Sequence, residues 1–156
     1  MKTNLLGVLA LLAGCAGLPS SAASKKHDSS ELTVTVSGDV QAALVDLRGR
    51  RTGWYGGWVE DIPNCRLEAI RDEVAEPQNY SFHFEVVRSQ RYELLLTPRT
   101  QGEVSIGIEG TLAGVRACSA KADTELVEGE SKWLLEWSSN GKKCRASITT
   151  PQRPKR

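Results

Sequence analysis

The stretch Leu32-Thr33-Val34-Thr35-Val36-Ser37 decides the fold, because apolar and polar side chains alternate in it residue by residue. Successive side chains of a β-strand point to opposite faces of a sheet, so one face of this stretch is apolar and the other polar. Residues 81–86, Ser-Phe-His-Phe-Glu-Val, alternate in the same way. Both stretches predict strands of an antiparallel sheet that is covered on one face.

Further segments have the length, the β-branched residues and the turn-like borders of strands. They are residues 40–47, 92–97, 104–109, 115–118, 132–137 and 144–149. About seven to nine strands at this spacing predict an all-β fold, a single antiparallel β-sandwich. Trp133 and Trp137 lie four residues apart on one predicted strand, so both are expected in the core.

Two local patterns add to this outline. Residues 66–76 place Leu67, Ile70 and Val74 on one face at helical spacing, which predicts a short helix. Asn140-Gly141 suits a two-residue hairpin turn, in which Trp137 would face Cys144.

One part of the sandwich resembles a known class of modules. Residues 91–98, Arg-Tyr-Glu-Leu-Leu-Leu-Thr-Pro, followed by residues 102–108, Gly-Glu-Val-Ser-Ile-Gly-Ile, resemble the paired strands of immunoglobulin-like modules of bacterial surface proteins. The resemblance covers a small part of the chain. It implies an immunoglobulin-like architecture and assigns no activity.

The N-terminus carries Lys2, an apolar run from Leu5 and then Leu12-Ala13-Gly14-Cys15. The apolar run is about ten residues long, whereas a membrane-spanning helix needs about 20, so it indicates a secretory signal. The tetrad resembles the lipobox of bacterial lipoproteins, whose cysteine becomes the acylated first residue of the mature protein. The resemblance implies lipidation of Cys15 and, because Ala16 follows it rather than aspartate, a place in the outer membrane.

The alternative is an ordinary signal cut after Ala22 or Ala23, which would yield a soluble secreted or periplasmic protein. The expected organisation is a signal peptide over residues 1–14, a flexible tether over 15–30, the β-sandwich over 31–150 and a disordered basic tail over 151–156. The tether would span on the order of 20 Å as a random coil.

The charge of the chain excludes one class of partner. The net charge of all 156 residues is +1, but residues 31–150 contain 14 basic and 18 acidic residues. Nucleic-acid binding requires a basic stripe on the fold, so no nucleic-acid partner is expected. The expected partners are the lipid bilayer, through the N-terminal lipid, and a protein of the cell envelope, with a glycan as the second option.

The four cysteines predict one disulfide bond. If Cys15 is lipidated, Cys65, Cys118 and Cys144 remain in a compartment that favours disulfides. Cys118 and Cys144 both lie in predicted strands, whereas Cys65 follows a Pro-Asn turn, so we expect the bridge between Cys118 and Cys144. Cys65 is then free, buried or bound to another chain.

The sequence contains no catalytic pattern. His27 lies in the tether and His83 on the polar face of a strand, and neither belongs to a metal-ligand motif. We expect no catalytic residues, no metal and no cofactor. Asp46, Glu60 and Asp61 are expected to be solvated or to form weak surface pairs with nearby arginines such as Arg50 and Arg51. The protein is therefore not expected to be an enzyme.

Residues 50–58, Arg-Arg-Thr-Gly-Trp-Tyr-Gly-Gly-Trp, form the most suggestive surface segment. Tryptophan, tyrosine and arginine are enriched at interaction hot spots, and glycine permits tight turns. One hypothesis is a protruding binding loop that contacts a partner. The other is a hairpin whose tryptophans fold back onto the sandwich. The residues concerned are Arg50, Arg51, Trp54, Tyr55 and Trp58.

The expected function is therefore that of a lipid-anchored binding or accessory protein in an outer-membrane or surface assembly, serving secretion, surface motility or envelope maintenance. One alternative is a periplasmic enzyme inhibitor or immunity protein that acts through residues 50–58. The other alternative is a structural surface module.

Overall fold

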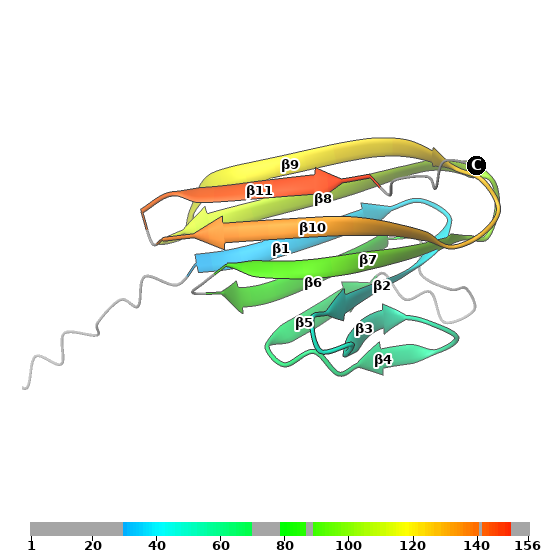
Figure 1. The fold of residues 1–156 in the computed structure, drawn as a ribbon, viewed down its shortest axis with the longest axis horizontal. Helices are drawn as coiled ribbons and strands as arrows, with labels where there is room; N and C mark the ends of the chain where they lie inside the picture. The colour runs from blue at the N-terminus through cyan, green and yellow to red at the C-terminus, as the bar shows by residue number, and fades with distance from the viewer. Residues whose placement is uncertain (1–29, 70–78, 87–88, 141, 151–156) are drawn as a thin grey trace, which may run out of the picture.

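The computed structural model describes residues 30–69, 79–86, 89–140 and 142–150. Within these residues the chain forms eleven β-strands in two antiparallel sheets, and no helix (Figure 1). The strands are β1 (Ser30–Ser37), β2 (Val40–Asp46), β3 (Arg51–Trp54), β4 (Trp58–Glu60), β5 (Cys65–Ala69), β6 (Asn79–Val86), β7 (Gln90–Pro98), β8 (Gly102–Leu112), β9 (Val115–Leu126), β10 (Ser131–Ser139) and β11 (Cys144–Thr149). The predicted all-β sandwich is confirmed.

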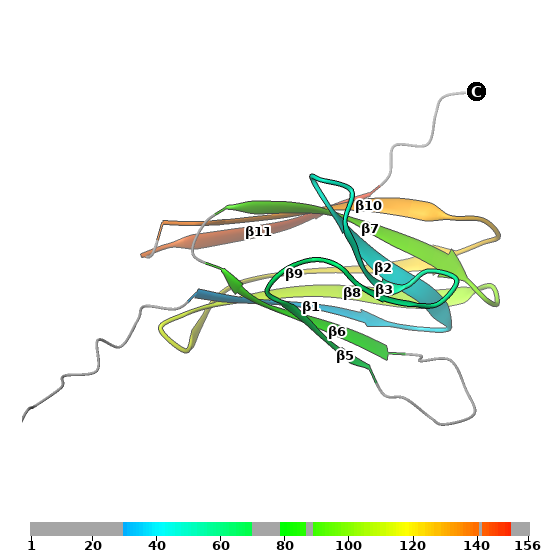
Figure 2. The same cartoon turned by 90° about the horizontal axis from the view of Figure 1, so that it is seen from below.

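The two sheets pack as layers, which Figure 2 shows from the side. The five-stranded sheet has the order β5-β6-β1-β8-β9, and the six-stranded sheet has the order β11-β10-β7-β2-β3-β4. Sheet-to-sheet packing hides one face of each strand and exposes the other, as the alternating sequence requires. The immunoglobulin-like resemblance stays a prediction.

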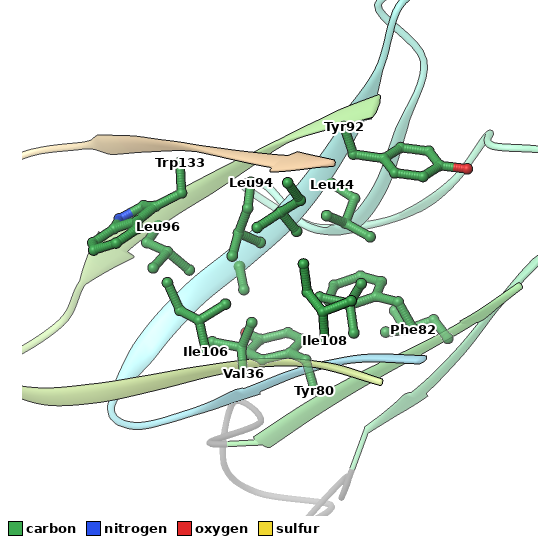
Figure 3. Packing of buried hydrophobic residues seen from close by; sticks show 14 of the residues in the cluster. Val36, Leu44, Tyr80, Phe82, Tyr92, Leu94, Leu96, Ile106, Ile108 and Trp133 are labelled. Carbon is green, nitrogen blue, oxygen red and sulfur yellow. The ribbon is translucent and has the colours of Figure 1, made fainter. Parts of the chain in front are cut away.

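The core lies between the two sheets and consists of the inward residues of the alternating strands. Figure 3 shows Val36, Tyr80, Phe82, Ile106 and Ile108 of the five-stranded sheet opposite Leu44, Tyr92, Leu94, Leu96 and Trp133 of the six-stranded sheet. Trp133 and Trp137 are buried, as predicted. Each such side chain contributes about 1.5–3 kcal/mol through its burial.

The predicted helix over residues 66–76 is wrong where it can be compared with the structure. Residues 66–69 belong to strand β5, which pairs with β6, while residues 70–76 lie outside the described part of the chain. Leu67 points into the core and its neighbours Arg66 and Glu68 are exposed, which is a period of two. The short segment is compatible with both a helical period and a period of two, and pairing with β6 decided in favour of the strand.

The predicted two-residue turn at Asn140-Gly141 is also wrong. Ser139 faces Cys144 and Trp137 faces Ala146, so the loop between β10 and β11 runs from Asn140 to Lys143. The Asn140 Oδ1 atom accepts hydrogen bonds from the backbone amides of Lys142, at 3.0 Å, and Lys143, at 2.8 Å. These side-chain bonds stabilise the longer loop.

The strand count exceeds the expected seven to nine because β3, β4 and β5 were not among the predicted strand segments, although the hairpin hypothesis for residues 50–58 anticipated β3 and β4. All three are short, and they lie within residues 51–69, where the sequence shows little alternation. The predicted strand over residues 40–47 also ends one residue early, at Asp46, because a turn begins there.

The strands run between two ends of the sandwich, which we call proximal and distal. The proximal end is where β1 begins at Ser30, beside the turn between β8 and β9 and the loop between β10 and β11 (Figure 1). The distal end holds the turns after β1, β3, β7 and β9. These two ends carry different side chains, as described below.

Candidate functional site

The suggestive segment 50–58 forms a short β-hairpin of β3 and β4. Trp54 pairs with Trp58 at the last register position, and the amide of Tyr55 donates a hydrogen bond to the carbonyl of Gly57 at 2.9 Å. Gly56 has a φ of 69°, a left-handed conformation that favours glycine. The glycines therefore serve the turn of the hairpin.

Strand alternation divides the aromatic residues of this hairpin between its two faces. Trp54 and Trp58 share the face of Thr52, which is fully buried, and both indoles pack against the core. Their ring centroids lie 5.1 Å apart with an interplanar angle of 88°, and Trp58 lies 6.5 Å from the ring of Tyr80. The edge-to-face pair covers the edge of the sandwich between β4 and β6. The two tryptophans thus fold back onto the sandwich, as the second hypothesis for this segment stated.

Arg51 and Tyr55 occupy the opposite, outward face of the hairpin. The guanidinium of Arg51 lies 4.2 Å from the ring centroid of Tyr55, within the range of a cation–π interaction. Tyr55 is 42% exposed, which is unusual for a large aromatic side chain of this protein. The arginine holds one face of the ring and leaves the rest of the side chain open to a partner.

Apolar side chains extend this outward face across the six-stranded sheet. Gly53 of β3 pairs with Ala43 on one side and with Val59 on the other, and Ala43 pairs with Leu95. Ala43 and Leu95 are buried without belonging to the cluster between the sheets. The sequence did not predict this row, because outward-facing positions of such strands are expected to be polar, whereas Ala43 and Leu95 are apolar.

Arg50 takes part in a different structure, the turn between β2 and β3. Asp46 accepts hydrogen bonds from the amides of Arg48 and Arg50 and pairs with the Arg50 guanidinium, whose Nε atom lies 2.7 Å from Oδ2. Burial raises the pKa of Asp46, but the bonds to Arg50 and Arg48 outweigh it and hold this pKa below the ordinary 3.8. Asp46 thus forms a surface pair, one of the two expectations for it, and Arg50 is tied to the turn.

The same turn presents Leu47, which is 81% exposed. Leu47 forms one wall of a shallow groove on the outer face of the six-stranded sheet, which is lined elsewhere by polar residues such as Arg91, Glu136 and Arg145. The sequence placed Leu47 at the end of a strand, so its exposure was not foreseen. The only sequence feature that could have indicated this exposure is the aspartate before Leu47, because aspartate often begins a turn.

The structure confirms the predicted disulfide between Cys118 and Cys144. The bridge connects β9 to β11, and therefore one sheet to the other, at the proximal end. Cys15 lies outside the described residues, so its lipidation stays a prediction.

Cys65 is a free, half-buried thiol beside Thr52. Burial raises the pKa of this thiol to about 12, although a hydrogen bond with Thr52 lowers it in part. The thiolate is the reactive form of cysteine, so Cys65 stays protonated and unreactive near neutral pH.

His83 lies on the outer face of the five-stranded sheet, at the position predicted for it. Its ring nitrogens lie 3.3 Å from Thr33 Oγ1, 3.0 Å from Ser81 Oγ and 3.3 Å from a carboxylate oxygen of Glu68. Histidine, cysteine and acidic side chains do not gather into a metal-binding group anywhere in the described part of the chain. The predictions of no catalytic residue and no cofactor stay predictions.

None of the described residues forms a helix that is long and apolar enough to cross a bilayer. Comparisons of the chain with known protein families, curated proteins and solved structures find no match.

Proposed function

We propose that the protein is a lipid-anchored binding protein of a bacterial cell envelope, a component of an outer-membrane or surface assembly. The pattern Leu12-Ala13-Gly14-Cys15 supports the anchor, with Cys15 as the acylated residue. Several acyl chains hold a protein at a bilayer stably, whereas one chain does so only marginally. The anchored part is a rigid sandwich whose two sheets are joined by a disulfide.

Tyr55 is the single observation that carries the binding role. It combines 42% exposure, a fixed position over Arg51 and a place at the distal end, away from Ser30 where the anchored segment would enter. A tyrosine beside an arginine on a rigid hairpin has the composition of an interaction hot spot. The binding surface consists of Arg51 and Tyr55 together with the half-buried Val59, which lies on the same outward face of the hairpin.

The geometry favours a protein partner over a glycan. Recognition of a sugar face uses exposed aromatic rings, but the two indoles of this hairpin pack inward and one face of the Tyr55 ring is occupied by Arg51. An exposed tyrosine edge beside an arginine and the half-buried Val59 suits a protein surface with a small apolar patch and a carboxylate. The partner is accordingly a protein of the same envelope.

The test is mild crosslinking in native envelopes, followed by affinity capture and mass spectrometry of the mature N-terminus and of the captured proteins. Wild type is compared with Cys15→Ala, Tyr55→Ala and Val127→Ala, the last being an exposed residue at a different turn. We expect a lipid-modified Cys15 and a defined partner that is lost in Tyr55→Ala and kept in Val127→Ala.

Three outcomes would contradict the proposal. A mature N-terminus near Ala23 would remove the anchor and favour a secreted protein. A captured hydrolase whose activity the protein blocks would favour the inhibitor alternative, and a partner insensitive to Tyr55→Ala would move the binding surface elsewhere.

A further inference from the structure

Two hairpin tips stand side by side at the proximal end. One is the turn from Leu112 to Val115 between β8 and β9, and the other is the loop from Asn140 to Lys143 between β10 and β11. We call them the proximal tips. The disulfide bond lies directly behind them, with the Cα atoms of Cys118 and Cys144 5.7 Å apart. The bridge therefore makes the two tips one rigid unit, although they come from different sheets.

The first tip exposes an aliphatic side chain. Val115 is 68% exposed, at the first position of β9, and it is among the most exposed large apolar residues of the described chain. A comparable residue, Val127, is 53% exposed at the distal end. The two valines allow the two ends of the sandwich to be compared with the same kind of side chain.

The second tip carries positive charge that nothing in the described chain neutralises. Lys142, Lys143 and Arg145 are exposed, and the structure records no ion pair for them among the residues it describes. The Asn140 side chain accepts hydrogen bonds from the backbone amides of both lysines, which fixes the loop backbone. The side chains of both lysines are exposed. A fourth cation, Arg116, pairs with Glu109.

The distal end has the opposite charge. The exposed residues Glu103, Glu125, Glu128 and Glu130 lie in its turns or at the adjoining strand ends. Glu31 and Glu85 are also exposed near the start of β1, and Arg99 pairs with Asp39 at the distal end. The contrast therefore concerns the turns themselves, which are basic at the second proximal tip and predominantly acidic at the distal end. Such a distribution orients a protein in front of a charged surface.

We propose that the proximal tips rest on an anionic lipid surface, with Val115 in the interfacial region and Lys142, Lys143 and Arg145 against the headgroups. Basic residues beside an apolar side chain are the features that a protein surface needs for such contact. The inference rests on the proposed function in one respect, since β1 begins at this end and an anchored Cys15 would bring the tips to the bilayer. The contact holds the sandwich upright and presents Tyr55 away from the membrane.

The experiment uses the protein purified from envelopes and reconstituted into vesicles. An environment-sensitive fluorophore is attached to Val115→Cys or to Val127→Cys in a Cys65→Ala background, because Cys65 is a free thiol that would otherwise compete for the label. In vesicles that contain phosphatidylglycerol, we expect the fluorophore at position 115 to shift to the blue and to be quenched by lipid-borne quenchers. The fluorophore at position 127 stays in water. Vesicles of phosphatidylcholine alone, or a high salt concentration, abolish the signal.

Matched charge variants test the lysines. Lys142→Glu with Lys143→Glu and, as a control, Lys121→Glu with Lys132→Glu change the net charge equally, but the control residues lie away from the tips. Because the acyl anchor holds every variant on the vesicle, the readout is the fluorophore at position 115: we expect the first pair to remove most of its blue shift and lipid quenching on phosphatidylglycerol vesicles, and the control pair to preserve them.

Equal exposure of the fluorophores at positions 115 and 127 on anionic vesicles would overturn the proposal. So would shielding of position 115 in native envelopes but not on vesicles, which would point to a protein partner at the tips. Mass spectrometry of the same preparation reports the lipid on Cys15 independently. If Cys15 carries no lipid, the anchor fails, while the same fluorophore still tests the tips on added vesicles.

Discussion

The indole ring of Trp137 lies directly against the backbone of Gly110, across the interior of the sandwich from β10 to β8. A Cβ atom at position 110 would overlap the ring carbons Cζ3 and Cη2 of this tryptophan, whose side chain is 2% exposed. Glycine at position 110 thus leaves the space that this buried indole occupies.

Gly110→Ala is expected to destabilise the fold strongly. The added methyl group has no space unless the buried indole moves, and overpacking of this kind costs about 1–3 kcal/mol. Urea denaturation measures the loss. The control is Gly102→Ala in the same strand, where a Cβ atom meets no heavy atom within 4 Å. A similar stability for the two variants would contradict the close contact.

Removal of the disulfide by Cys118→Ala with Cys144→Ala is expected to lower the free energy of unfolding by about 3 kcal/mol in the chain-entropy model. The sequence separation of the two cysteines is 26 residues, which makes the constraint on the unfolded chain substantial. A reductant should destabilise the wild type to the same extent and leave the double variant unchanged. Sensitivity of the double variant to the reductant would show that the bridge lies elsewhere.

Trp54→Ala and Trp58→Ala are each expected to lower the free energy of unfolding by about 2–3 kcal/mol, less than for a fully buried tryptophan. Their rings cover the edge of the sandwich and contact each other. Tyr55→Ala, by contrast, is expected to change stability by less than about 1 kcal/mol, because this side chain faces water. Thermal denaturation of the three variants separates the roles. An unchanged melting temperature in Trp58→Ala would contradict the buried position of this ring and favour the protruding-loop hypothesis for residues 50–58.

Stability is expected to fall as the pH rises above 9. Burial raises the pKa of Cys65 from 9.0 to about 12 and the pKa of Tyr92 from 10.0 to about 12. The unfolded chain releases these protons from pH 9–10 upward while the folded chain keeps them, so stability is highest below pH 9 and is lost toward pH 12. The slope is at most about 1.4 kcal/mol per pH unit for each group.

Urea denaturation at pH 8, 10 and 11 measures this dependence. Cys65→Ala and Tyr92→Phe should each flatten the decline, since each removes one titrating group. The folded wild type should also react slowly with a thiol reagent at pH 8, and quickly in urea. Rapid modification of Cys65 in the folded protein would show that its thiol is more accessible and more acidic than described.

Ala113→Asn is expected to stabilise the protein by about 0.5–1 kcal/mol. Ala113 has a φ of 52° and the following Gly114 a φ of 78°, which is the turn in which asparagine followed by glycine is preferred. Asn64, at a φ of 60°, provides the converse case, and Asn64→Ala should be destabilising by a similar amount. Equal and opposite shifts of the melting temperature would support both assignments.

Much of the fold could be predicted from local patterns. Alternation in residues 32–37 and 81–86 predicted strands with one buried face, and those strands are β1 and β6. The four-residue spacing of Trp133 and Trp137 on one strand also predicted both in the core, and the location of Cys118 and Cys144 in predicted strands favoured the bridge between them. These features depend on the period of the side chains, which is a property of the sequence itself.

The candidate site could be predicted only in part. The sequence identified residues 50–58, but it could not separate Arg51 and Tyr55, which face outward, from Trp54 and Trp58, which face the core. It also missed Leu47, because a residue at the end of a strand is buried or exposed according to where the turn begins. The helix prediction that included residues 66–69 failed for a different reason. Three apolar residues over so short a segment do not distinguish a period of two from a helical period.

The sequence by itself determined the all-β class and the inward faces of the long strands, because alternation acts within a single strand. It favoured the bridge between Cys118 and Cys144, but the packing of β9 against β11 brings the two cysteines together. Only the tertiary structure decided which hairpin residues reach the surface, that Gly110 receives Trp137, and that Val115 and Lys142 meet at one end. Each of these depends on contacts between strands far apart in the chain, which form when the two sheets pack and one face of every strand is excluded from water.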